Sequence, residues 1–490
     1  MPALPHDTAL THARIAWFGL PALLLLTVLA YGNSFAGVWQ FDDHAVLLAD
    51  PRVQSLAAWW HSLPHLRPVF KLSVALQHQV DAGLFGFHLF NLVLHLANTL
   101  LLFRLLRALP LPALRKSPGL VLLITAVFAL HPAQTEVVTY LSGRSVALEA
   151  FGLLLALNVW QRWLSQGGRA RLLWLLPALG IALGSRESAV IAPLWLAWLW
   201  HDNRGGSRRL LWLALVAATA LLVAVLMLPR YRELLWLALQ WQGVDQLLAV
   251  QTQAIAHLFA VALGAAPLNA DPVLTVTPLT SGSGMICALA VFVLLVLAWR
   301  HRRQRSLLWV AVSWLVLSWL PTHSVFVRFD PVNDRQLYLA LPGIALLLCW
   351  SVLAVANLSF AAANRFSRKR FSQTPSPSTP ASPERSSAKL PSAWRGWMMP
   401  LLAIALSLTL AMATQARNTV YHSEIRFWQD VVTKAPSNAR GWNNLGIAYQ
   451  QAGRLPAAEQ AFEQALALRP DYQRAAVNLR LLRRQQSPSP

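Results

Sequence analysis

The chain has 490 residues, of which 56% are hydrophobic and only 12% are charged. Soluble globular domains carry about 25% charged residues, so this composition, with a mean hydropathy of +0.45, excludes a series of soluble domains. The formal net charge of +21 would fit a nucleic-acid-binding protein, unless the charges have a topological role. Long uncharged stretches, such as residues 210–228, match the thickness of a bilayer and predict a polytopic membrane protein.

The apolar stretches predict about eleven membrane helices. They cover residues 15–32, 88–108, 119–138, 146–163, 172–184, 188–200, 210–228, 284–299, 307–321, 337–357 and 397–416. We interpret 172–200 as two short helices, because the polar sequence GSRES interrupts it, although a single long helix would invert everything downstream. Both cysteines, Cys287 and Cys349, lie within predicted spans, so neither a disulfide framework nor a cysteine metal site is expected.

Basic residues are unevenly distributed between the loops. With a cytoplasmic N-terminus, the inner segments hold 22 of the 41 Lys and Arg residues and three acids, whereas the outer segments before residue 417 hold 9 basic and 11 acidic residues. Lys and Arg are retained on the cytoplasmic side of membrane proteins. We therefore predict a multi-pass protein of the inner (plasma) membrane and no nucleic-acid partner.

The predicted organisation has four parts. A transmembrane domain covers 1–363, and a Pro/Ser-rich segment, 364–396, is expected to be a disordered cytoplasmic linker. The last transmembrane helix covers 397–416, and a helical repeat region follows over 420–486. Counting spans places this repeat region outside the cytoplasm, on the periplasmic side.

The first outer loop, residues 32–87, contains the adjacent acids Asp42 and Asp43 about ten residues beyond the first span. Carboxylates close to a bilayer are costly to maintain and are therefore candidates for function. One of them could act as a general base, while its neighbour shifts its pKa or holds a cation. The structural alternative is that one carboxylate forms an Asx-turn or caps a helix.

The C-terminal region contains the spacing of a tetratricopeptide repeat. Eight positions fit the pattern: Trp442, Leu445, Gly446, Tyr449, Ala458, Phe462, Ala465 and Pro470. The pattern predicts one full repeat over about 439–472, a preceding half-repeat helix at 425–435 and a closing helix at 473–483. Two roles are open for it, a cap that stabilises the membrane domain or a docking surface for a polypeptide.

Several sequence blocks follow one another in a characteristic order. They read YxNSF, FDDH, DPRV, RPV and HLFNLVLH, then FALHPAQTEVVTYLSGRSVAL, GSRESAV and DRQLYLALPG. In order and spacing, residues 31–345 resemble the membrane domain of the transmembrane and tetratricopeptide-repeat O-mannosyltransferases and their bacterial relatives. Those proteins are GT-C-type glycosyltransferases that use polyprenyl-phosphate-linked sugars. The resemblance implies an all-α fold, a polytopic GT-C-like helical domain followed by the repeat.

The resemblance also implies roles for particular residues. An inverting transfer needs a base near the acceptor, Asp42 or Asp43, and positive charge near the departing phosphate. Guanidinium groups suit phosphate, and the expected donor-phosphate ligands are Arg67, Arg144, Arg186 and Arg335. The alternatives for these arginines are interfacial snorkelling or structural ion pairs between sequence neighbours, Arg186–Glu187 and Arg335–Asp334. Supporting roles are expected for His44, His131, Glu136, Glu187, Asp334 and Tyr338, although a packing role at a helix end is an alternative for His131.

We therefore expect an integral membrane enzyme that transfers a sugar from a polyprenyl-phosphate donor to an extracytoplasmic acceptor. The acceptor is a protein hydroxyl, with the polypeptide docked on the repeat, or an envelope glycan. A divalent cation stays open as a cofactor, since no histidine pair has a dependable metal-binding spacing. The alternatives are a non-catalytic scaffold that presents the repeat to envelope partners and a transporter of lipid-linked sugars. A transporter should carry mid-membrane charges, whereas here Glu149 is the main charge away from the helix ends.

Overall fold

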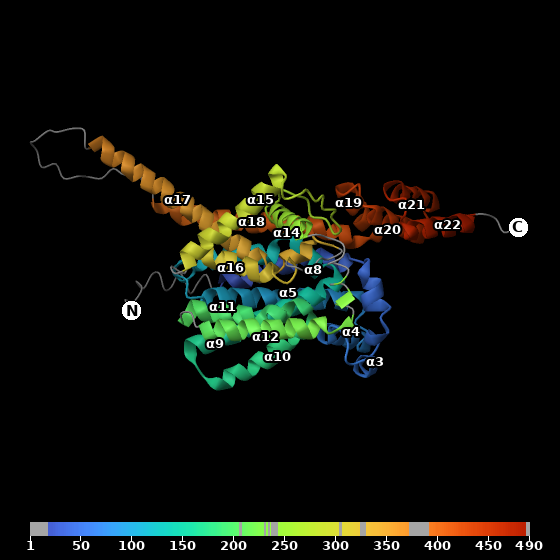
Figure 1. Ribbon diagram of the computed structural model, residues 1–490, viewed down its shortest axis with the longest axis horizontal. Helices are drawn as coiled ribbons and strands as arrows, with labels where there is room; N and C mark the ends of the chain where they lie inside the picture. Colours follow the sequence, from blue (N-terminus) through green and yellow to red (C-terminus); the bar gives the residue numbers. More distant parts are fainter. Residues whose placement is uncertain are drawn as a thin grey trace, which may run out of the picture.

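The computed structural model describes residues 18–204, 208–229, 232–233, 236, 244–302, 306–323, 330–371 and 392–486. Over these ranges the protein is all-α, as predicted, and no strand occurs in them. Helix α17 (Leu341–Phe371) projects from one end of a helical bundle, and the repeat helices α19–α22 project from the other (Figure 1). The remaining long helices are α2 (Leu20–Tyr31), α5 (Gly83–Ala108), α7 (Pro118–Leu130), α9 (Arg144–Gln166), α10 (Leu175–Ser185), α11 (Ala192–Arg204), α12 (Arg208–Leu226), α14 (Val244–Ala262), α15 (Gly282–His301), α16 (Leu307–Trp319) and α18 (Ser392–Asn418).

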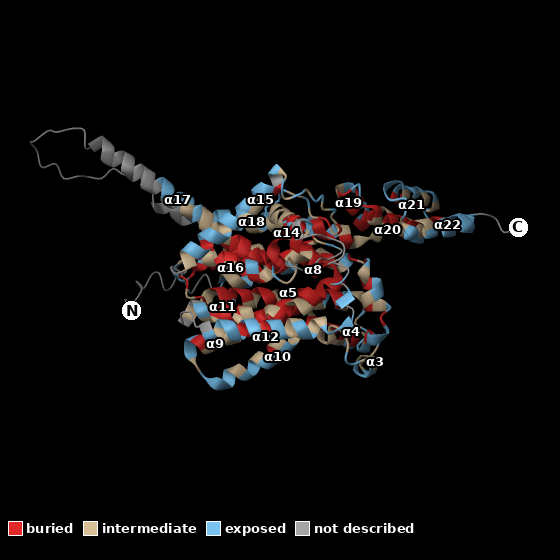
Figure 2. Cartoon of the chain, in the orientation of Figure 1, coloured by how far each residue is buried: buried red, intermediate tan, exposed pale blue. Residues whose placement is uncertain are grey.

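Each predicted span overlaps at least one helix in the described part of the chain. Among the described residues, five helices are long and apolar enough to cross a bilayer, and a sixth span arises if α7 and the segment Pro132–Val138, bent by 46° at His131, are counted together. Shorter apolar helices accompany them, so the protein has the composition of a multi-pass membrane protein. Buried residues gather along the central helices, whereas α12 and α15 are largely exposed (Figure 2). Exposed apolar helices are what a lipid environment requires.

The stretch 172–200 forms two helices, α10 and α11. A short 3-10 helix, Glu187–Ile191, separates them, and the break falls at the polar sequence GSRES. Helix α10 packs closely on α9 because Gly152 has no side chain. A Cβ at Gly152 would lie 2.5 Å from the backbone nitrogen of Ala182.

The segment 364–396 differs from its prediction at both ends. Helix α17 continues to Phe371 and α18 begins at Ser392, so these flanks are helical and not disordered. The flanking sequence FAAANRFSRKRF is rich in Ala, Arg and Lys, which have high helix propensity and extend the apolar helix beyond its hydrophobic part. Residues 372–391 lie outside the described ranges.

The repeat region consists of α19 (Glu424–Lys434), α20 (Ala439–Gln451), α21 (Leu455–Leu468) and α22 (Gln473–Gln486). This is the predicted full repeat between a half-repeat helix and a closing helix. Phe462 packs directly over Gly446, where a Cβ would lie 2.5 Å from the aromatic ring. Trp428 of α19 belongs to a buried cluster with Tyr140 of the bundle. The first helix of the repeat region is therefore packed against the membrane domain.

Candidate active site

A small polar pocket lies where the loop 32–87 meets one end of the bundle and the repeat region. Its volume is about 40 Å³, enough for a water molecule. Four parts of the chain supply its lining: the first loop, the turn after α7, the segments on either side of α15–α16, and helices α19 and α20. The lining residues are Phe41, Asp42, Glu136, Tyr140, Ala270, Asp271, Asp330, Val332, Asn333, Arg335, Phe427, Trp428 and Arg440.

Asp42 is half-buried and lines this pocket. Its backbone N–H donates a hydrogen bond to the Tyr140 hydroxyl at 3.1 Å, which holds the loop against the bundle. Burial raises the pKa of the Asp42 carboxyl above its ordinary value, and the positive charge of Arg335 opposes this rise. A carboxylate with a raised pKa beside a cation in a pocket is suited to accept a proton.

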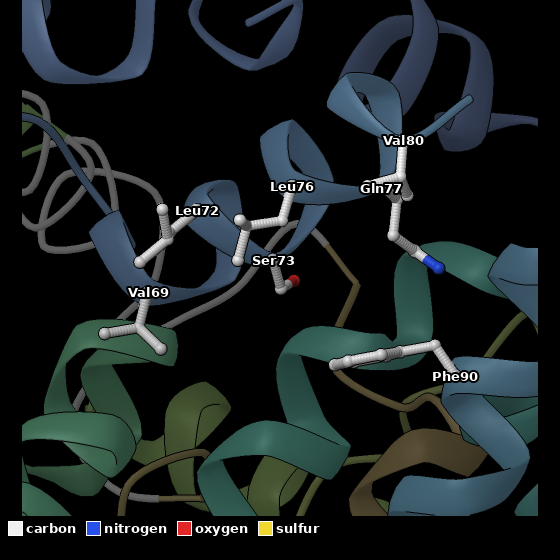
Figure 3. Close-up of a pocket in the computed structure, with 7 residues that line it drawn as sticks. All are labelled: Val69, Leu72, Ser73, Leu76, Gln77, Val80 and Phe90. Atoms are coloured by element: carbon white, nitrogen blue, oxygen red, sulfur yellow. The ribbon is translucent and has the colours of Figure 1, made fainter. Parts of the chain in front are cut away.

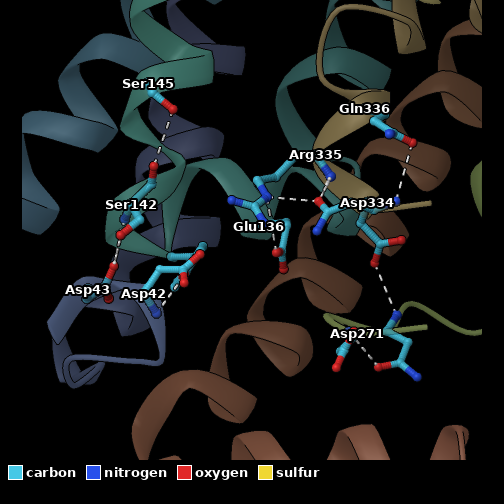
Figure 4. A network of polar contacts seen from close by, with 12 residues as sticks. Asp42, Asp43, Glu136, Ser142, Ser145, Asp271, Asp334, Arg335 and Gln336 are labelled. Atoms are coloured by element: carbon cyan, nitrogen blue, oxygen red, sulfur yellow. Dashed lines mark hydrogen bonds and ion pairs between the residues drawn. The ribbon is translucent and has the colours of Figure 1, made fainter. Parts of the chain in front are cut away.

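Asp43 is fully buried and does not line the pocket. Its Oδ1 accepts hydrogen bonds from the Ser142 hydroxyl at 2.5 Å and the Ser142 backbone N–H at 2.8 Å (Figure 4). Its Oδ2 accepts the Gln40 N–H at 3.0 Å and closes a local turn. Burial raises the pKa of Asp43 to about 7, although these hydrogen bonds favour the charged form. The turn-forming alternative therefore describes Asp43, while Asp42 is the carboxylate that is open to the pocket.

Arg335 is the predicted arginine that lines the pocket. It follows Asp334 at the start of a 3-10 helix, Asp334–Leu337, yet its Nε lies 3.5 Å from Glu136 Oε1. The structural alternative named for Arg335 was an ion pair with Asp334, and the structure shows an ion pair with Glu136 instead. The guanidinium also lies over the Tyr140 ring, 5.4 Å from its centroid. Glu136 Oε2 accepts a hydrogen bond from the Tyr421 hydroxyl at 2.8 Å, which ties the residues before the repeat to the same network.

Asp334 and Tyr338 are buried beside the pocket and are not part of its lining. Asp334 Oδ2 accepts the backbone N–H of Asn269 at 3.1 Å, and burial raises the pKa of this carboxyl to about 7. The Tyr338 hydroxyl lies 2.8 Å from His95 Nδ1 and accepts a hydrogen bond from Asn98 Nδ2 at 3.0 Å, both on α5. Tyr338 thus joins the segment before α17 to the centre of the bundle.

The other three predicted arginines lie elsewhere. Arg67 forms a bidentate pair with Glu187, with distances of 2.9 and 3.0 Å, and Arg186 Nε lies 3.7 Å from Glu149 Oε2 on α9. Arg67 and Arg186 thus both form ion pairs with residues that are distant in the sequence. A clamp of four arginines is not assembled around Asp42, and donor-phosphate binding by Arg67 and Arg186 stays a prediction.

Arg144 is fully buried at the start of α9. Its Nε donates to Asn91 Oδ1 at 2.9 Å and its Nη2 to the Phe87 carbonyl at 3.2 Å, both on α5. Its guanidinium also lies over the Phe90 ring, 4.5 Å from the centroid. These contacts join α9 to α5, so a phosphate would have to enter the bundle to reach Arg144.

The two predicted histidines have structural partners. His44 is exposed, and its Nε2 lies 2.5 Å from Glu424 Oε1 of α19. His131 Nδ1 accepts the Ala133 N–H at 3.1 Å, and its Nε2 lies 3.2 Å from the Ala262 carbonyl, the helix-end packing role named above as its alternative. Within the described ranges, no group of three or more His, Cys, Asp or Glu side chains could hold a metal ion.

A second hollow, of about 360 Å³, lies between α4 (Pro68–Gln79) and α5 (Figure 3). Its lining is almost entirely apolar and consists of Val69, Leu72, Ser73, Leu76, Gln77, Val80 and Phe90. It contains no ionisable side chain, so it offers no group for acid–base chemistry.

Most residues of the site were not among the predicted ones, and Tyr140, Ser142, Trp428 and Arg440 are the most informative of these. Tyr140 and Ser142 lie within the quoted block TYLSGRS, so their neighbourhood was marked in the sequence. Trp428 and Arg440 come from the repeat region, and no local pattern indicates that they reach a loop near the N-terminus. Such a contact is set by the packing of distant segments.

Comparisons with known proteins support part of these expectations. A family model described as a tetratricopeptide repeat matches residues 439–472. The protein O-mannosyl-transferase Tmtc2 of Drosophila melanogaster is 30% identical over 137 residues, a match that covers 24% of this chain and 14% of that protein. The match thus spans a small part of both chains. No solved structure matches the chain.

Proposed function

We propose that the protein is a GT-C-type glycosyltransferase that moves a sugar from a polyprenyl-phosphate donor to a hydroxyl group of an extracytoplasmic protein. The observation that carries the proposal is the pocket in which Asp42, with a raised pKa, lies near Arg335 at the end of apolar helices. The partial similarity to a protein named as an O-mannosyl-transferase supports glycosyl transfer as the reaction class.

In the proposed reaction, Asp42 takes the proton of the acceptor hydroxyl while the oxygen attacks the anomeric carbon. The bond from this carbon to the lipid-phosphate oxygen breaks in the same step, so a single displacement inverts the configuration. Arg335 favours the ionised form of Asp42 and supplies positive charge near the leaving phosphate. Asp43 holds the loop that carries Asp42 through its hydrogen bonds to Ser142. Arg67, Arg144 and Arg186 are proposed to bind the donor phosphate along its path.

The proposed location is the plasma membrane, with the N-terminus in the cytoplasm and the Asp42 pocket and the repeat region outside. The distribution of Lys and Arg between the loops supports this orientation. Gln451, an exposed residue of α20, offers a test once Cys287 and Cys349 are replaced by serine. A cysteine introduced by Gln451→Cys should react with a membrane-impermeant maleimide in intact cells, and labelling that requires permeabilised cells would reverse the orientation.

The reaction is tested with the purified full chain in phospholipid vesicles. The donor is polyprenyl-phosphate-[¹⁴C]mannose, the acceptors are Ser/Thr-rich peptides, and parallel samples contain EDTA to test for a cation. The wild type should label the peptide, and Asp42→Asn should lower the rate at least about 100-fold by removing the base. Asp81→Asn, at an exposed site of the same loop, is the matched control.

Each outcome has a defined meaning. Wild-type activity in a folded Asp42→Asn variant would remove Asp42 as the base. If the wild type transfers no sugar, the assay is repeated with other polyprenyl-phosphate sugars and with glycan acceptors. Lack of transfer in all of these assays would refute the proposed reaction. The scaffold alternative predicts that the double variant Asp42→Asn, Asp43→Asn keeps its cellular function, whereas the enzyme predicts its loss without unfolding.

A further inference from the structure

The repeat region supplies one wall of the Asp42 pocket. Phe427 and Trp428 of α19 and Arg440 of α20 line the pocket together with Asp42 and Arg335. The repeat helices therefore contact the same small space as the candidate base. A role limited to docking a distant polypeptide would not require this arrangement.

Arg440 fastens this wall to the membrane domain. Its Nε donates to Asp271 Oδ2 at 2.8 Å, and its Nη2 contacts Asp271 Oδ1 and also lies 2.6 Å from Asp330 Oδ1. Asp271 is buried, whereas the Asp330 side chain is 52% exposed. A shielded bidentate pair is stronger than an exposed single contact. Of the two partners, Asp330 is thus the one that separates more easily.

Trp428 acts on the residue that precedes Asp42. Phe41 has a left-handed backbone conformation, with φ at 43°, which is strained for a non-glycine residue. In this conformation its ring meets Trp428 edge to face, with the centroids 5.2 Å apart. Such an aromatic pair stabilises the fold beyond the effect of its buried area. The contact with the repeat region therefore helps to maintain the backbone strain next to Asp42.

We infer that the repeat region is a working part of the active site, with Trp428 and Arg440 as positioning residues. Trp428 sets the position of the Asp42 carboxylate through Phe41. Arg440 holds the repeat wall over the pocket and separates from Asp330 when substrates enter, since a space of about 40 Å³ is too small for a sugar ring. This inference rests on the proposed function and assigns the repeat a role within the same site.

The test compares single variants of the full chain in the transfer assay described above. Trp428→Ala should lower kcat about 10- to 100-fold with little change in donor KM, because it displaces the base and leaves the donor contacts in place. It should also move the acid limb of the pH profile to lower pH, since a less buried Asp42 loses part of the rise in its pKa. Trp428→Phe should restore most of the rate.

Asp330→Asn tests the opening of the pocket, and Arg483→Gln is the matched control. Asp330→Asn should lower the acceptor KM severalfold, because a binding-competent open form becomes more populated. Arg483 forms ion pairs with Glu459 and Glu463 within the repeat and does not line the pocket. Its replacement should change neither kcat nor KM.

A second measurement does not depend on activity. Hydrogen exchange at the backbone amides of Asp42 and Asp43 should be faster in Trp428→Ala than in Arg483→Gln, because loss of the ring contact loosens the loop. Equal exchange would overturn the inference, and so would a folded Trp428→Ala variant with wild-type kcat and pH profile. If Trp428→Ala does not fold, Asp330→Asn decides, and a wild-type acceptor KM in that variant overturns the inference. If Asp42→Asn is inactive while the Trp428 and Asp330 variants behave like the wild type, only this inference is refuted. An inactive wild type refutes the proposed function.

Discussion

Replacing Asp43 with Asn should change how the stability of the protein depends on pH. Burial raises the pKa of Asp43 from 3.8 to about 7, while hydrogen bonds from Ser142 and Gln40 oppose the rise. In the unfolded chain the carboxyl titrates near its ordinary pKa of about 3.9. Between about pH 4 and pH 7 the folded protein therefore binds more protons than the unfolded chain, and the free energy of unfolding falls as the pH rises.

The size of the effect follows from the two pKa values. Each pH unit in this window lowers the free energy of unfolding by about 1.4 kcal/mol, roughly 4 kcal/mol in all. Asn at position 43 cannot ionise, and its side-chain oxygen can still accept the hydrogen bond from the Ser142 hydroxyl. It loses the hydrogen bond from the Gln40 N–H, which lowers the free energy of unfolding by about 1–3 kcal/mol at every pH. Asp43→Asn should thus be less stable than the wild type at pH 4.5 and more stable at pH 8.

The assay is thermal unfolding of the purified full chain in detergent, at steps from pH 4.5 to 8. Subtracting the wild-type stability from that of the variant at each pH isolates the contribution of Asp43. Other groups, such as Asp334, whose pKa is also raised to about 7, contribute equally to both proteins.

Asp50→Asn is the control, because the pKa of Asp50 is lowered in the folded protein whereas that of Asp43 is raised. Burial opposes ionisation of Asp50, but hydrogen bonds from Arg52 and Lys71 outweigh it and hold the pKa at about 2. Its carboxylate therefore stabilises the fold over the whole pH range of the assay, so Asp50→Asn should lower stability by a constant amount. A difference curve for Asp43→Asn that is flat, or that declines with pH, refutes the reasoning.

Three further substitutions test the packing of two helix pairs and the role of Arg67. Gly446→Val should destabilise the repeat region by about 1–3 kcal/mol, because a Cβ there would overlap the Phe462 ring, and thermal unfolding followed by circular dichroism measures this loss. Gly152→Leu should lower the unfolding temperature in detergent by separating α10 from α9, and an unchanged temperature would contradict the close contact. Arg67→Gln should raise the donor KM if Arg67 binds phosphate, whereas a loss of stability with unchanged KM would mean that its pair with Glu187 is structural.

The secondary structure was largely predictable because its signals are local. Apolar runs predicted the positions of the bundle helices, and the spacing of residues such as Gly446 and Phe462 predicted how α20 and α21 cross. The prediction of disorder was wrong at both ends of the segment 364–396. There the Pro/Ser-rich composition was taken to include residues that belong to the helices α17 and α18. Composition describes a segment on average and does not define where a helix ends.

The ion pairs show where local reasoning fails. Arg335 pairs with Glu136 and not with its neighbour Asp334, and Arg186 forms an ion pair with Glu149 on α9. Side chains of adjacent residues in these turns diverge, and their partners are provided by whichever helix end is packed nearby. This choice depends on the arrangement of the whole bundle.

By itself, the sequence determined the all-α class, the positions of the apolar helices, the repeat and the loop 32–87 with its two acids, because hydrophobicity and helical period act over short distances. Only the tertiary structure decided that Asp42 lines the pocket while Asp43 is buried against Ser142, since two consecutive residues in a turn project in different directions. It also brought Trp428 and Arg440 to that pocket, a contact between the ends of the chain that no local pattern specifies.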